Sequence, residues 1–286
     1  ISDDNTFHLI DTQLPPAAAR VTAFETMGGK LWKKATSPTA DDFVSARDDY
    51  SVAEGLASRI GRRQDINYPE VAGDDKFACS DPVVAAKPEN ANRCAGPAKL
   101  KPIIDDAFVK GVAGTKPIVQ AARIETALLW FFYLSSRSEV WTCSFDDITD
   151  CDSAAAYYTA DPKRDAPQGI ARYVSALGPE THNRIFDALL AERCWRDIDK
   201  AFPTDPNTSK YYPLAQSQLN KAYLRGLALI LRSRIASVGC LTGEKREAAI
   251  ESVKILGGLI DQQATVFNAT AAATLRSYAT NPTTDA

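Results

Sequence analysis

A run of nine uncharged, almost entirely apolar residues constrains the fold more than any other segment. It extends from Thr126 to Leu134, inside the stretch RIETALLWFFYLSSRSEVWTC at 123–143. A helix that crosses a membrane needs roughly 20 consecutive apolar residues, so this run has less than half of the required length. Charged residues lie close beyond both of its ends. We therefore predict no membrane span here, but a helix that is buried almost all round inside a bundle.

Helical patterns continue through most of the remaining sequence. Apolar residues recur at helical spacing in two long segments before residue 64, and again in several segments after residue 99. No Asn-Gly or Asp-Gly turn joins two alternating segments, so no hairpin of β-strands is indicated. The sequence thus predicts an all-α fold, an irregular bundle of about eight helices with disulfide-stapled loops.

The predicted domain organisation is one helical domain covering 1–286, with a loop insertion at 65–98 that is rich in proline and lacks a sustained period. A weak internal similarity suggests an alternative. LSSRS at 134–138 and LRSRI at 231–235 each close a long apolar segment. The alternative is two pseudo-repeated halves, 1–98 plus 99–152, and 153–286. Arginine also suits the C-terminal end of any helix, which explains the similarity without a repeat.

The six cysteines indicate disulfide bonds. None belongs to a Cys-x-x-Cys pair and the chain has only two histidines, so the spacing of a zinc site is absent. Neighbours in the sequence favour the pairs Cys79–Cys94, Cys143–Cys151 and Cys194–Cys240. Disulfides persist in oxidising compartments, and a sequence that begins with Ile rather than Met is typical of a chain whose signal peptide has been removed. We therefore predict a secreted or periplasmic protein.

Charge and motifs exclude several functional classes. The formal net charge is -3, and no strongly basic stretch supports nucleic-acid binding. The sequence has no Gly-x-Ser-x-Gly nucleophile motif, no His-Glu-x-x-His metalloprotease motif and no glycine-rich phosphate loop. No residue pattern thus points to catalysis; enzymatic activity stays open, with the balance against it.

Three residues are the candidates for binding a metal ion such as iron. Glu125 and Glu192 lie in the middle of apolar helical segments, and His182 lies near the start of another. Carboxylates that project into a bundle are how helical proteins build iron and manganese sites. The alternative for Glu125 is a buried ion pair with an arginine, and the alternative for His182 is a solvent-facing position in the first turn.

Aromatic residues at helix ends are the candidates for binding a small ligand. Tyr157, Tyr158 and Trp195 combine an apolar ring with a polar tip, which suits contact with a ligand or a partner. The alternative is that such side chains pack beneath loops.

Residues 156–178 and the segment DALLAERC at 187–194 resemble the algal and bacterial iron-assimilation family, whose members are also described as low-carbon-dioxide-induced proteins. The matching positions are Tyr157, Tyr158, Leu189, Leu190, Ala191, Glu192, Arg193 and Cys194. The resemblance implies a secreted all-helical protein connected with iron capture, with ligation by glutamate rather than histidine. The first functional hypothesis is accordingly a secreted or periplasmic binding protein for a metal ion or small ligand. The alternative is a structural protein that assembles with copies of itself on a surface or in a filament.

Overall fold

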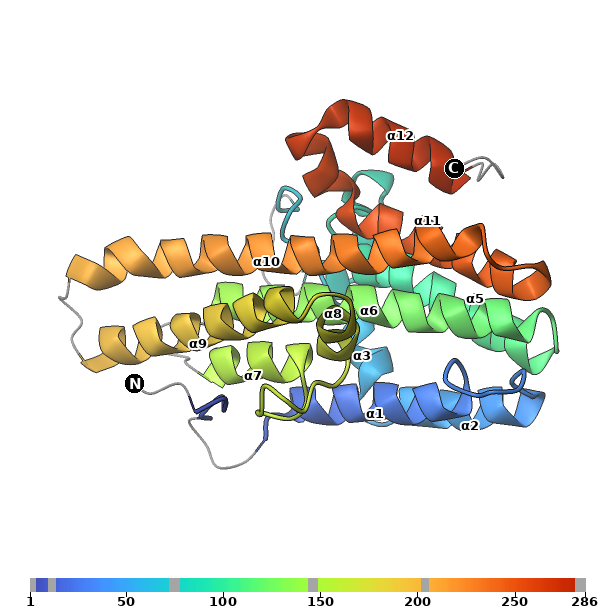
Figure 1. The fold of residues 1–286 in the computed structure, drawn as a ribbon, viewed down its shortest axis with the longest axis horizontal. Coiled ribbons are helices and arrows are strands. Elements are labelled where there is room, and N and C mark those ends of the chain that lie inside the picture. Colours follow the sequence, from blue (N-terminus) through green and yellow to red (C-terminus); the bar gives the residue numbers. More distant parts are fainter. Residues whose placement is uncertain (1–3, 10–13, 72–77, 144–148, 202–205, 281–286) are drawn as a thin grey trace. The chain divides into compact units, whose positions relative to one another are not determined.

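The computed structural model of the chain describes residues 4–9, 14–71, 78–143, 149–201 and 206–280, and these residues are helical almost throughout (Figure 1). The prediction of an all-α fold is confirmed, with more helices than the eight expected. The α-helices are α1 (Pro16–Lys30), α2 (Ala40–Tyr50), α3 (Leu56–Ile60), α4 (Pro82–Ala85), α5 (Lys101–Val112), α6 (Pro117–Thr142), α7 (Thr149–Tyr158), α8 (Ile170–Leu177), α9 (Pro179–Ala201), α10 (Pro206–Val238), α11 (Gly243–Phe267) and α12 (Ala269–Thr280). Three shorter helical turns are η1 (Ala78–Ser80), η2 (Pro88–Asn90) and η3 (Gly96–Leu100).

The chain divides into two compact units. Unit 1 contains Ile1–Thr22 and Phe132–Leu229, and unit 2 contains Ala23–Phe131 and Ile230–Ala286. The boundaries fall inside α1, α6 and α10, so each of these helices contributes residues to both units. The boundaries of these units differ from those of the two predicted halves. The single domain covering 1–286 and the repeat of two halves both remain predictions.

The apolar run from Thr126 to Leu134 lies in α6. Leu128, Leu129 and Phe131 are fully buried in unit 2, as expected for a helix surrounded by other helices. Backbone N–H groups at the start of α6 donate to a carboxylate of another helix: those of Ile118 and Val119 lie 2.5 and 3.3 Å from Glu244 Oε1. None of the described helices is long and apolar enough to cross a membrane.

Two of the three predicted disulfide bonds are formed. Cys79 is bonded to Cys94 and Cys143 to Cys151. The prediction of a Cys194–Cys240 bond is wrong, because both of these cysteines are free. Proximity in sequence does not bring these two cysteines together, because α10, a continuous helix of 33 residues about 50 Å long, stands between them in the chain.

The loop insertion at 65–98 is stapled and ordered by local contacts where it is described. Besides the Cys79–Cys94 bond, it holds α4 and the turns η1 and η2. Arg93 donates hydrogen bonds to the backbone carbonyls of Asp65 and Tyr68 and to Gln64 Oε1. These bonds tie the end of the insertion to its beginning within unit 2.

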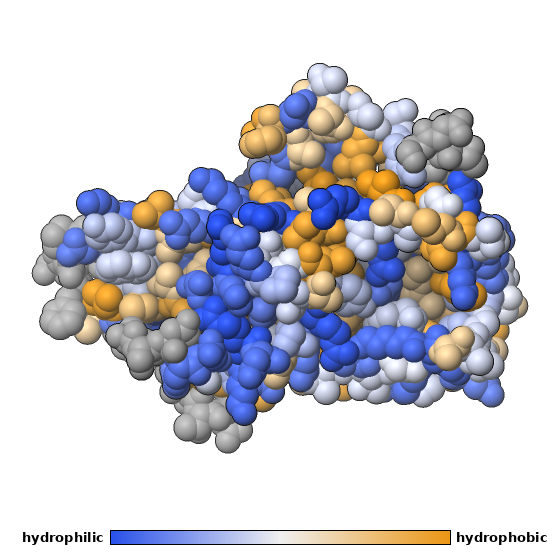
Figure 2. Space-filling view, in the orientation of Figure 1, coloured by the Kyte–Doolittle hydropathy of each residue, from blue (hydrophilic) through white to orange (hydrophobic). Residues whose placement is uncertain are grey.

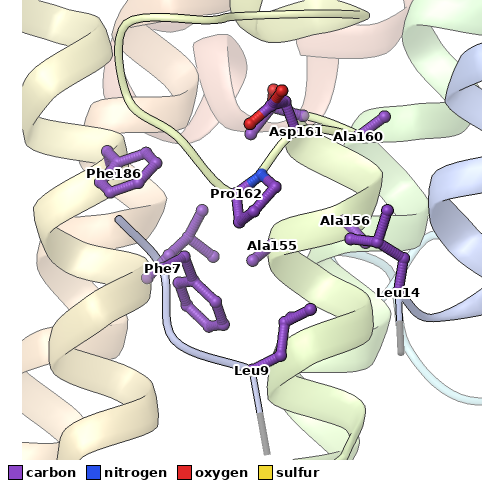
Figure 3. A pocket seen from close by; sticks show the side chains of 11 residues that line it. Phe7, Leu9, Leu14, Ala155, Ala156, Ala160, Asp161, Pro162 and Phe186 are labelled. Atoms are coloured by element: carbon purple, nitrogen blue, oxygen red, sulfur yellow. The ribbon is translucent and has the colours of Figure 1, made fainter. Parts of the chain in front are cut away.

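In unit 1, the N-terminal segment lies against α7 and the chain that follows it. Thr6 forms an isolated antiparallel bridge with Lys163, and the N–H of Phe7 donates to the carbonyl of Pro162 at 2.8 Å. Figure 3 shows Phe7 and Leu9 extending from this segment toward α7. The void left beneath them is about 10 Å³, which is barely enough for one water molecule. The segment therefore fills its own apolar recess.

Candidate functional site

Unit 2 contains a cavity of about 290 Å³. Its walls come from the end of α1 and the following loop, from α6, from the end of α10 and from the beginning of α11. The lining residues are Leu31, Trp32, Lys34, Ala35, Thr36, Ser37, Pro38, Ile118, Ala121, Ala122, Glu125, Arg234, Ser237, Leu241, Lys245, Ala248, Ala249 and Ser252. We call it the Glu125–Arg234 cavity.

Small side chains on two neighbouring helices account for the space. Ala121 and Ala122 of α6 line the cavity together with Ala248 and Ala249 of α11. A methyl group at each of these positions leaves unfilled the volume that a leucine or isoleucine would occupy in a close-packed interior. The helices are nevertheless joined, since the hydroxyl groups of Thr126 and Ser252 form a hydrogen bond of 3.1 Å. The cavity is thus a local gap in an otherwise packed contact.

A buried ion pair provides the charged part of the lining. Arg234 Nη2 donates to Glu125 Oε1 at 2.9 Å, and Glu125 is only 5% exposed. Such a carboxylate requires a partner because desolvation of an unpaired charge is costly. The structure therefore supports the ion-pair alternative for Glu125. The partner comes from α10, whereas Arg123, the nearest arginine in sequence, forms an ion pair of 2.6 Å with Asp106.

Lys34, on the loop after α1, is also paired. Its ammonium group lies 2.5 Å from Asp42 Oδ2, and this contact helps to lower the pKa of Asp42 to about 2. The same carboxylate accepts the backbone N–H of Thr39 in a capping box at the start of α2. The loop between α1 and α2, which forms one wall of the cavity, is therefore held in place by the contacts of Lys34 and Thr39 with Asp42.

A second concavity in unit 2 is wider, and three of its four charged side chains already form ion pairs. It measures about 490 Å³ and is lined in part by Trp130, Arg123, Lys254 and Glu251. Lys254 Nζ lies 2.8 Å from Glu251 Oε1, and Arg123 is engaged by Asp106. We regard the Glu125–Arg234 cavity as the better candidate because its walls enclose it from four parts of the chain.

Glu192, the second predicted metal ligand, lies in unit 1 and is 1% exposed. Neither carboxylate oxygen has a hydrogen-bond partner. The nearby hydroxyl of Tyr212 lies 3.4 and 3.3 Å from the backbone carbonyl oxygens of Val140 and Cys143. Burial raises the pKa of Glu192 to about 8, even though the Tyr212 hydroxyl, Arg137 and Arg196 favour the charged form. Glu192 is therefore largely protonated at neutral pH.

His182, the third predicted metal ligand, is also buried, so the solvent-facing alternative for it is wrong. Its Nδ1 lies 2.8 Å from the Tyr158 hydroxyl, and its Nε2 lies 2.9 Å from the backbone carbonyl oxygen of Arg164. A carbonyl only accepts, so Nε2 carries the proton and Nδ1 accepts from Tyr158. Burial lowers the pKa of His182, which favours this neutral form. Neither nitrogen has a free lone pair for a metal ion.

The predicted metal ligands do not form one site in the part of the chain that is described. Glu125 belongs to unit 2, while His182 and Glu192 belong to unit 1. Among the described residues, no group of three or more His, Cys, Asp or Glu side chains is placed to hold a metal ion.

The aromatic candidates serve packing. Tyr157 and Tyr158 are buried, and the prediction that they contact a ligand stays a prediction. Tyr157 accepts a hydrogen bond of 3.0 Å from Arg20, and Tyr158 bonds His182. Trp195 is half-buried and stacks on Tyr211 with ring centroids 5.2 Å apart. Helix-end tyrosines thus pack inward here, as the alternative interpretation stated.

Sequence reasoning missed most of the cavity. Trp32, Arg234 and Lys245 were not among the candidates. The paired alanines at 121–122 and 248–249 are a signal that could have been used, because they leave little side-chain volume on one face of each helix. Comparisons of the chain with family models, with curated proteins and with solved structures gave no match.

Proposed function

We propose that this chain is an exported binding protein that holds a small organic ligand in the Glu125–Arg234 cavity. The observation that carries the proposal is the cavity itself, about 290 Å³ in volume, with apolar side chains at ten of its 18 lining positions and polar or charged ones at the other eight. Ligand sites typically begin at about 300 Å³ and combine hydrophobic lining with a small number of polar contacts. The cavity therefore suits a small molecule.

Export is supported by the two disulfide bonds. Bonds such as Cys79–Cys94 and Cys143–Cys151 persist in secreted or periplasmic proteins and are rare in reducing compartments. The metal-ion part of the hypothesis, iron included, has no such support among the described residues, because none of them gather into a ligand group. We therefore rest the proposal on the small-ligand part.

Filling the cavity tests the proposal. Ala121→Leu places three more carbons against the cavity lining, and we expect it to abolish binding of small apolar compounds while the chain still folds. The measurement is the thermal unfolding of wild type and variant with hexanoate, 1-hexanol and hexylamine. A compound present at ten times its Kd stabilises the wild type by about 1.4 kcal/mol, which raises Tm by a few degrees.

The matched control is Ala273→Leu, the same change on the exposed face of α12. It should keep the response of the wild type. The proposal is contradicted if none of the three compounds shifts the wild-type Tm, or if Ala121→Leu responds as strongly as the wild type.

Self-association is the second candidate function, and one surface feature favours it. Figure 2 shows apolar side chains in small groups among polar ones on the face in view. Two adjacent apolar side chains at the end of α11, Val266 and Phe267, are 76% and 94% exposed. If copies of the chain meet there, Phe267→Ser should convert assemblies to monomers in analytical ultracentrifugation. A wild type that stays monomeric at high concentration would rule this candidate out.

A further inference from the structure

Polar groups in the lining of the Glu125–Arg234 cavity already have partners within the chain. Glu125 accepts from Arg234, and the Ser252 hydroxyl is bonded to that of Thr126. The indole N–H of Trp32 is buried against α1, 3.0 Å from the place that a Cβ at Gly28 would take, so Trp32 offers apolar surface to the cavity.

The charged side chains of the cavity lining do not all have a partner of opposite charge. Arg234 is matched by Glu125 and Lys34 by Asp42. The remaining cation is Lys245, for which no ion pair is found among the described residues. Lys245 lies in the first turn of α11, where the helix dipole adds positive potential, and the carboxylate of Glu244 in the same turn is engaged by the N–H groups of Ile118 and Val119. One end of the cavity therefore carries an unmatched positive charge.

The two charged parts of the lining lie at different levels of the helices. The contacts of Ile118 with Glu244 and of Thr126 with Ser252 show that α6 and α11 run side by side in the same direction. Glu125 is therefore level with residues near 251, six positions beyond Lys245, which corresponds to about 9 Å along the axis. The alanines of both helices fill the interval. An anionic head at Lys245 would thus avoid Glu125 and leave its apolar body against the alanines and Trp32.

We propose that the ligand class is a small monocarboxylate with a short apolar body. This inference rests on the proposed function and specifies its ligand. The carboxylate accepts from Lys245 at the start of α11, and the apolar body occupies the space between Trp32 and the alanine pairs. A monoanion matches the single unpaired cation, whereas a dianion such as phosphate would leave a surplus negative charge in a partly desolvated site.

The test is isothermal titration calorimetry of the full chain with hexanoate, 1-hexanol, hexylamine and inorganic phosphate. Because Lys245 is exposed, its contact with the carboxylate is a rim ion pair of modest strength. We expect hexanoate to bind about fivefold more tightly than 1-hexanol, and hexylamine and phosphate to bind more weakly than either. Raising the salt concentration should weaken the binding of hexanoate but not that of 1-hexanol.

Lys245→Gln should remove the preference for hexanoate and leave the affinity for 1-hexanol unchanged. Lys221→Gln, at an exposed lysine of unit 1, is the charge-matched control and should retain the preference. Equal binding of the three six-carbon compounds, tighter binding of phosphate, or a preference that survives Lys245→Gln overturns the carboxylate assignment alone. Absence of binding by all three six-carbon compounds overturns the cavity as a ligand site, and this inference with it.

Discussion

Glu192→Gln should stabilise the chain by about 4 kcal/mol at pH 8 and leave its stability unchanged near pH 4.5. The carboxylate of Glu192 is 1% exposed and neither of its oxygens has a hydrogen-bond partner. Burial raises its pKa from 4.5 to about 8. The folded state therefore holds a proton that the unfolded state releases above pH 4.5.

The sign of the pH dependence follows from this shift. A carboxyl group whose pKa is raised on folding stabilises the fold fully below the unfolded value of 4.5, and this stabilisation is lost as the pH rises through about 8. Glutamine resembles the protonated form and does not titrate, so the variant should lack this loss. His182 and Asp65, whose pKa values are also shifted by burial, titrate in both proteins and cancel in the difference.

Urea unfolding of both proteins between pH 4.5 and pH 9 provides the measurement. The difference in free energy of unfolding should grow steadily with pH and then level off above pH 8. Glu89→Gln, at an exposed carboxylate, is the control and should follow the wild type. Parallel curves for Glu192→Gln and wild type would show that Glu192 is ionised in the folded chain throughout this range.

Gly96→Ala is expected to destabilise the chain by about 3 kcal/mol. Gly96 is the first residue of η3 and its N–H donates to the carbonyl of Arg63 at 2.9 Å. An added Cβ would lie 2.1 Å from the carbonyl oxygen of Ile60 and 2.8 Å from that of Arg63. Both obstacles are backbone atoms, so no side-chain rotation relieves the clash. The insertion at 65–98 would have to move away from the end of α3.

Gly29→Ala is the matched control, since nothing lies within 4 Å of the added Cβ at this exposed position of α1. Alanine favours a helix over glycine by about 0.5–1 kcal/mol, so this variant should be slightly more stable than the wild type. Denaturant midpoints of the two variants should therefore move in opposite directions. A Gly96→Ala protein as stable as the wild type would contradict the close backbone contact.

Local patterns in the sequence predicted the helices and the short-range disulfides. Cys79–Cys94 and Cys143–Cys151 are 15 and 8 residues apart, so proximity in sequence was a sound guide. It failed for Cys194 and Cys240, which are 46 residues apart with a continuous helix of 33 residues between them in the chain. The last helical part of the chain is divided at Asn268 into α11 and α12, and the Asn268 Oδ1 accepts the N–H of Ala271 at 3.0 Å and caps α12. Asn followed by Ala-Thr is a capping signal that could have been used.

The candidate site was less predictable, because it depends on which helices meet. Glu125 was correctly singled out as a buried carboxylate, but its partner Arg234 is 109 residues away in sequence. Periodicity identifies the buried face of a helix without identifying its neighbour. The space between Ala121 of α6 and Ala248 of α11 likewise exists only where these two helices lie together. The solvent-facing alternative for His182 failed, because the hydrogen bonds from Tyr158 and to Arg164 make its burial possible.

The most direct test of the central claim is a crystal structure of the wild-type chain soaked with 6-bromohexanoate. The bromine gives an anomalous signal that places the apolar end of the compound without ambiguity. We predict a bromine peak inside the Glu125–Arg234 cavity beside Trp32, with the carboxylate at Lys245. A cavity that stays without bromine in crystals soaked to saturation, or one that is closed by the side chains around it, would contradict the account.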